Sequence, residues 1–217
     1  SRRGGVLADV IVHIFPDTIL IDLDCTAVEQ VFDHLNSYIV MEDVQVQNTT
    51  ENTHWLWILG PESNKHLPKD APSSTLPIEF LGIEGVAIAT RPTNTVAIWE
   101  DCVKLGARPI GWYALNMARV ERGAPMFMID FDSNNLPHET SLVQSRVRFD
   151  KGCYLGQEIV ARMESLGQPK QRLVQLKMSE DKLPISGAQL WADETGSGTP
   201  VGVVTSSAIS PLRGGVP

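Results

Sequence analysis

The sequence predicts an α+β fold that is followed by the beginning of an all-β domain. Apolar residues at helical spacing alternate with short runs rich in Ile, Val and Leu, and from about residue 170 onward only strand-like runs and turn residues remain. Apolar residues make up 42% of the chain and charged residues 20%, which favours packed cores over disorder or a coiled coil. The apolar runs are too short for the roughly 20 residues that span a bilayer.

Residues 1–60 predict a first α+β subdomain. Residues 6–15 and 18–23 indicate a strand pair that turns at Pro16-Asp17. Thr26 with Glu29 predicts a capping box that opens a helix to about Tyr38, because the apolar residues that follow share one helical stripe. Two further strands are predicted at residues 44–47 and 55–59.

Residues 61–169 predict a second α+β subdomain. It starts with a proline-rich loop (61–77), continues with a strand (83–90) and two helices (96–105 and 112–122, ending at Gly106 and Gly123), and then becomes irregular. A last helix is expected at 158–166. Alternating residues at 172–177 and 201–205 predict that 170–217 begin a separate all-β domain. The sequence has no initiator Met and no further strands that would complete this domain. We therefore expect the chain to be a portion of a longer protein.

The net charge and the spacing of the cysteines exclude several classes of protein function. The formal charge is 18 − 26 = −8, which argues against a general nucleic-acid binder. The cysteines at 25, 102 and 153 have no zinc or cluster spacing, and an odd thiol indicates a reducing compartment. Scattered histidines give no metal pair, and the nucleophile-elbow, P-loop and dinucleotide motifs are missing from the sequence. Cys25 and Cys102 are interpreted as small apolar fillers.

The octet from Lys151 to Glu158 (KGCYLGQE) is the most unusual stretch. Two glycines bracket Cys153-Tyr154 and allow close approach of a ligand, and a position before a helix favours a thiolate. Residues 146–172 carry six basic and three acidic residues, a local charge of +3, which suits a small anionic ligand. A buried structural cysteine at a glycine-rich turn is the equally weighted alternative.

A second candidate site lies at the end of the predicted helix 112–122. Glu121 has the chemistry to accept paired hydrogen bonds from an amidine-like edge, such as that of a pterin, or it is simply a solvated helix end with an ion pair. Trp112 either stacks on a flat ligand or fills the core.

The octet, followed by Arg162, resembles the signature of the YgfZ family of folate-binding proteins, which are related to the glycine-cleavage T-protein (aminomethyltransferase). Residues 4–9, 119–123, 130–139 and 201–211 are similar to further elements of that family, so the resemblance covers nearly the whole chain. It implies ferredoxin-like subdomains around a central channel for tetrahydrofolate, followed by a C-terminal β-barrel. By this comparison about sixty residues are missing before Ser1, including the catalytic Asp of an aminomethyltransferase.

The resemblance also implies site residues. Cys153 matches the family's required thiol, with Lys151 and Tyr154 beside it as the expected catalytic group. The residues expected at the folate are Glu121, which would face the pterin, Trp112, Gln157, Glu158 and Arg162. No metal ligand is expected.

The leading hypothesis is a tetrahydrofolate-binding YgfZ-type factor that supports assembly or repair of iron–sulfur clusters in client enzymes through Cys153. It would be an accessory factor rather than a classical aminomethyltransferase. The alternative is a folate-dependent one-carbon (aminomethyl) transferase or demethylase, and a third interpretation is a folate-bound scaffold without chemistry. Expected partners are folate and, transiently, iron–sulfur client or assembly proteins, with no nucleic acid or membrane. The expected location is the cytoplasm, with the mitochondrial matrix as alternative.

Overall fold

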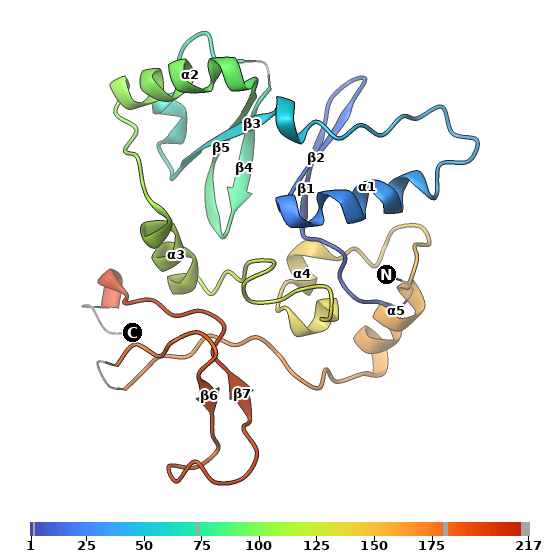
Figure 1. Cartoon of the computed structure of the whole chain (residues 1–217), viewed down its shortest axis with the longest axis vertical. Coiled ribbons are helices and arrows are strands. Elements are labelled where there is room, and N and C mark those ends of the chain that lie inside the picture. The colour runs from blue at the N-terminus through green and yellow to red at the C-terminus, as the bar shows by residue number, and fades with distance from the viewer. Residues whose placement is uncertain (2, 73, 180–181, 214–217) are drawn as a thin grey trace. The chain divides into compact units, whose positions relative to one another are not determined.

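The computed structural model describes residues 1–217 except 2, 73, 180–181 and 214–217. The chain divides into two compact units: unit 1 comprises Ser1–Val44 and Pro125–Pro217, and unit 2 comprises Gln45–Ala124. Each unit is described by itself (Figure 1). The domain boundaries at residues 60 and 169 stay predictions.

Unit 2 is built on a three-stranded antiparallel sheet. Its strands are β3 (His54–Leu59), β4 (Thr75–Phe80) and β5 (Ile83–Thr90), in the order β3-β5-β4. The strands predicted at 55–59 and 83–90 are confirmed, and the central strand β5 buries every residue from Val86 to Thr90. The prediction of a loop over 61–77 is wrong at its end, because β4 includes Pro77. An edge strand tolerates proline, since one side of its backbone needs no ladder partner.

Two helices accompany this sheet. Helix α2 (Pro92–Lys104) lies against β3 and starts four residues before its predicted start, with Pro92 in the first turn, where a missing N–H costs nothing. Helix α3 (Trp112–Glu121) is confirmed. Gly123 ends it with φ of 63°, and the N–H of Ala124 donates to the carbonyl of Arg119 at 2.9 Å, so a glycine-dependent C-cap stops the helix where predicted.

Unit 1 begins with a confirmed antiparallel hairpin, β1 (Val10–Ile14) and β2 (Ile19–Leu23), which leads into α1 (Val28–Asn36). The predicted Thr26 capping box is wrong. Residue 27 is the N-cap of α1, and a 3-10 turn (Cys25–Ala27) precedes it. The carboxylate of Asp24 accepts from the Thr26 N–H at 2.9 Å, so the capping oxygen comes from two residues earlier than expected.

The remainder of unit 1 is mostly irregular, as predicted for 125–148. It contains α4 (Val143–Arg146), α5 (Gln157–Leu166), close to its predicted span, and a short antiparallel pair, β6 (Gln189–Leu190) and β7 (Gly202–Val203) (Figure 1). Other 3-10 turns are Thr50–Asn52, Ser63–His66, Pro137–Glu139 and Pro211–Arg213. Strands predicted at 44–47 and 172–177 are wrong: these residues alternate in polarity but pair with no strand among the described residues. The C-terminal barrel stays a prediction, and residues 214–217 lie outside the described residues.

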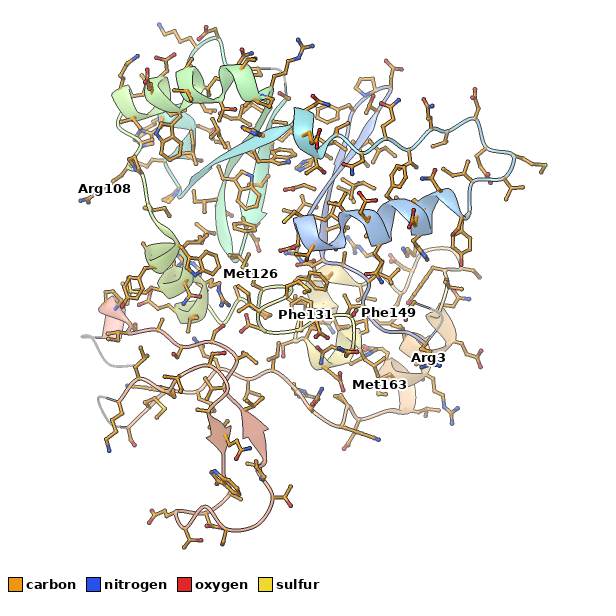
Figure 2. The ribbon with its side chains drawn as sticks, in the orientation of Figure 1. Arg3, Arg108, Met126, Phe131, Phe149 and Met163 are labelled. Atoms are coloured by element: carbon orange, nitrogen blue, oxygen red, sulfur yellow. The ribbon has the colours of Figure 1, made fainter. Side chains whose placement is uncertain are left out.

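The core of unit 1 joins its two chain segments. Ala27 packs with Phe127 and Phe131, whose rings meet edge to face at 5.6 Å (Figure 2 labels Phe131). Asp130 ties the same loop to the C-terminal segment by accepting hydrogen bonds from the hydroxyls of Thr205 and Ser206, each at 2.6 Å. Among the described residues, the helices are all too short or too polar to cross a membrane.

Candidate functional site

The KGCYLGQE segment folds into a tight turn that opens α5. The N–H of Gln157 donates to the carbonyl of Tyr154 at 3.1 Å, and the side-chain oxygen of Gln157 accepts from the N–H of Tyr154 at 3.0 Å. Lys151 places its Nζ 5.1 Å from the centre of the Tyr154 ring, within range of a cation–π interaction. The structure therefore brings together three predicted site residues, Lys151, Tyr154 and Gln157, and Gln157 closes the turn.

The glycines of this segment permit close packing against the N-terminal residues. Gly156 has φ of 83°, and a Cβ there would meet the carbonyl oxygen of Ser1 and the backbone of Gly4. Gly4 has φ of 74° and lies against Ile159 in the same way. Residues 4–9 and the octet, both found by the family resemblance, thus contain two glycines in mutual contact.

Cys153 is exposed, so the alternative of a buried structural cysteine is wrong. It precedes Gln157, the first residue of α5, by four positions and lies outside the first helical turn. Cys25 is also exposed, which contradicts its interpretation as a filler, whereas Cys102 is buried as expected. Burial, together with Asp101, raises the pKa of the Cys102 thiol, which keeps that thiol protonated.

The other two residues expected from the octet signature lie on α5 itself. Glu158 and Arg162 are exposed and one turn apart, at the i, i+4 spacing that suits an ion pair on a helix surface. Their assignment to folate stays a prediction.

In unit 2, α3 carries Glu121 at its last position, half-buried. Trp112 lies nine residues earlier, which on a helix is about two and a half turns, so the two side chains project from opposite faces roughly 13.5 Å apart along the axis. A ring that contacts Glu121 is therefore out of reach of Trp112. The structure places both residues on one helix without bringing them together.

Sequence reasoning missed Tyr113, which shares the helix stripe of Glu121. Tyr113, Met117 and Glu121 follow one another at four-residue spacing, so they lie on one face of α3. Tyr113 is 63% exposed and offers its ring to solvent or a ligand. Counting helical spacing back from the carboxylate identifies this residue from the sequence.

Asp9 is a second missed residue. It directly precedes β1, and its Oδ1 lies 3.3 Å from the Nε of Arg146. Burial raises the pKa of the Asp9 carboxyl, while Arg146 and a backbone hydrogen bond from Val10 oppose that shift. An acid within an otherwise apolar strand-like run was the available sequence signal.

A third missed feature is a histidine–carboxylate pair. The side chain of His138 is 8% exposed, and its Nε2 lies 3.1 Å from the Oε2 of Glu164. The pair borders an open cavity of about 430 Å³ that also includes Met163, which projects from α5 (Figure 2). The two partners are 26 residues apart in the sequence, so no local sequence pattern predicts the contact. Within the described residues, no cluster of three or more His, Cys, Asp or Glu side chains is arranged to hold a metal ion.

The fold is that of the glycine-cleavage aminomethyltransferases. The crystal structure of aminomethyltransferase T from Bartonella henselae superposes with a TM-score of 0.78 at 20% sequence identity, covering 99% of this chain and 63% of that one. No family profile matches the chain.

Sequence comparison also identifies aminomethyltransferases as relatives of the chain. The chain is 25% identical to an aminomethyltransferase of Bacteroides fragilis over 98% of its own length and 65% of the relative. It is 24% identical to one from Thermotoga sp. strain RQ2, over 99% and 64%. A chloroplastic protein of Arabidopsis thaliana, named as a candidate transferase, is 27% identical over 89% and 48%. The chain is thus homologous to aminomethyltransferases and spans about half to two thirds of the length of these relatives.

Proposed function

We propose that the chain binds a reduced folate and serves one-carbon transfer of the aminomethyl type. Homology to aminomethyltransferases along nearly the whole chain supports this proposal and favours the transferase over the iron–sulfur factor as the leading hypothesis. The observation that carries it is the stripe of Tyr113, Met117 and Glu121 on α3, because these residue types suit a flat ring with an amidine-like edge.

The stripe fits the pterin of tetrahydrofolate in its chemistry. The carboxylate of Glu121 would accept two parallel N–H groups, and the Tyr113 ring and Met117 thioether would contact the flat ring. A negative charge at the C-terminal end of a helix opposes the helix dipole, at a cost of about 0.3–1 kcal/mol, so Glu121 is a poor choice for the helix alone. When bound, tetrahydrofolate would supply the nitrogen atoms that carry the one-carbon unit.

Folate binding is tested by calorimetric titration of tetrahydrofolate into the chain and its variants. We expect Glu121→Ala to weaken binding 10- to 100-fold, because a pair of charge-assisted hydrogen bonds is lost. The control Glu100→Ala removes an exposed carboxylate on α2 and should bind like the wild type. Equal binding by Glu121→Ala, or none by the wild type, contradicts the proposal.

Transfer is tested by following formation of methylene-tetrahydrofolate from an aminomethyl donor. Since the bound folate accepts the one-carbon unit, Glu121→Ala should lower turnover at subsaturating folate, whereas Glu100→Ala should not. A wild type that binds folate but transfers nothing would remove the transferase proposal and leave folate binding intact.

A second candidate function is the YgfZ-type factor for iron–sulfur clusters. It is favoured by one observation, the exposed thiol of Cys153. This residue lies in the chain between Lys151 and Tyr154, whose side chains contact each other. We expect Cys153→Ala to keep the fold, because an exposed side chain contributes little packing, and to abolish rescue of iron–sulfur enzyme activity in cells that lack the endogenous factor. Cys25→Ala, at the other exposed thiol, is the control and should rescue fully. Full rescue by Cys153→Ala excludes a role for this thiol.

A further inference from the structure

We infer that unit 1 contains a binding pocket for a small anion, a carboxylate or a phosphate, beside the KGCYLGQE segment. A cavity of about 200 Å³ opens between the N-terminal residues, the end of α4 and the start of α5. Its lining includes three basic side chains, part of the octet and an apolar residue of α5: Arg146, Arg148, Lys151, Tyr154, Leu155 and Val160. This inference goes beyond the proposed function and does not depend on it.

The charge of the lining specifies the ligand class. Among the described residues, none of those that line the cavity is acidic. Arg146 is compensated by Asp9 at 3.3 Å, whereas Arg148 and Lys151 form no ion pair with the described residues. Lys151 instead lies over the Tyr154 ring, a contact that orients the ammonium group without neutralising it. Two uncompensated positive charges thus line a small cavity on a chain whose formal charge is −8.

The volume of the cavity and its apolar lining residues restrict the size and chemistry of the ligand further. Sites for drug-sized ligands usually measure about 300–1,000 Å³, so a cavity of about 200 Å³ suits an anionic group with only a few attached atoms. Val147, Leu155 and Val160 form apolar wall beside the cations. The guanidinium of Arg148 presents a planar pair of donors that matches a carboxylate or phosphate. A free phosphate and the carboxylate end of a larger molecule share this chemistry.

The wall of the cavity is held in place by the glycine contacts. Gly4 lines the cavity and packs against Ile159 and Val160, and Gly156 packs against Ser1 and Gly4. Each of these two glycines adopts a positive φ, which a side chain would strain. The Gln157 hydrogen bonds further close the turn from Tyr154 to Gln157. The side of the cavity that Gly4, Tyr154 and Val160 line is therefore held by contacts within the chain.

The test is a chemical-shift titration of the ¹⁵N-labelled chain at constant ionic strength, with inorganic phosphate in one arm and acetate in the other. We expect saturable shifts confined to the octet and to residues 146–148, and the tighter-binding probe distinguishes phosphate from carboxylate as the preferred anion. Arg148→Gln and Lys151→Gln should each weaken binding at least fivefold. Lys151→Arg, which keeps the charge, should restore it.

The control is Lys177→Gln, an exposed lysine of unit 1 that lies away from the cavity. It removes the same charge and should leave both affinities unchanged. Absence of saturable shifts with both probes overturns the inference. An equal loss in Lys177→Gln also overturns it, because binding would then follow the overall charge instead of the pocket. Neither result bears on the folate titration at Glu121, so the two proposals fail separately.

Discussion

Asp22 shows how a single buried carboxyl makes stability depend on pH. It lies in β2, opposite Ile11 of β1, and burial raises its pKa to about 6 despite a hydrogen bond from the N–H of Leu23. Because the folded state binds this proton more tightly than the unfolded chain, the free energy of unfolding falls as pH rises from about 4 to about 6. Above that range the folded chain holds a half-buried negative charge.

We therefore predict that Asp22→Asn stabilises the chain at pH 7 by about 1 kcal/mol, which is less than the raised pKa alone implies because the carboxyl is partly solvated. Below about pH 4 the carboxyl is protonated in both states, so the difference from the wild type should disappear. Urea unfolding of both proteins across pH 3.5–7.5 measures this. A difference that does not change with pH contradicts the assigned pKa.

At the scale of elements, the packing of the N-terminal segment on α5 depends on glycine. Both Gly4 and Gly156 adopt positive φ, and their Cα atoms approach neighbouring chain where a Cβ has no room. The same octet contains Gly152, at which an added Cβ would meet nothing within 4 Å. Two glycines of one motif thus have different structural roles.

We predict that Gly156→Ala destabilises the chain by about 1–3 kcal/mol, because the new side chain strains the backbone and collides with the N-terminal residues. Gly152→Ala is the matched control and should change the free energy of unfolding by less than about 0.5 kcal/mol. Chemical denaturation of both variants makes the comparison. Equal stability of the two variants means that the contact of Gly156 with Ser1 and Gly4 is not formed in solution.

At the scale of the whole molecule, the two compact units do not follow chain order. Unit 2 is continuous, whereas unit 1 is assembled from the two segments on either side of it. The core of unit 1 illustrates this, since Ala27 comes from the first segment and Phe127 and Phe131 from the second. Unit 2 closes its own sheet, with β5 between β3 and β4.

We predict that residues 45–124 fold when expressed alone, because all three strands of the sheet and both helices lie within them. A fragment of 80 residues buries only a modest core, so its stability should be low but its unfolding cooperative. Thermal unfolding followed by circular dichroism tests this. A fragment without a cooperative transition contradicts the prediction.

The sequence by itself determined the features that depend on local chemistry. The β1–β2 hairpin, the α3 and α5 helices and the glycine after α3 follow from periodicity and turn residues, and the sequence also singled out Glu121 and the Cys153 octet as candidate sites. The predicted spans of the two helices agree with the structure to within a residue or two, because capping and hydrophobic spacing act within a few positions of the chain.

Only the tertiary structure decided the features that require a distant partner. Residues 44–47 and 172–177 alternate like strands but join no sheet in the described part of the chain, and Pro77 lies in a strand because β5 accepts it at an edge. The Asp9–Arg146 contact and the cavity beside the octet join residues more than a hundred positions apart. Backbone hydrogen-bond partners and burial are properties of the folded surroundings, so no local pattern encodes them.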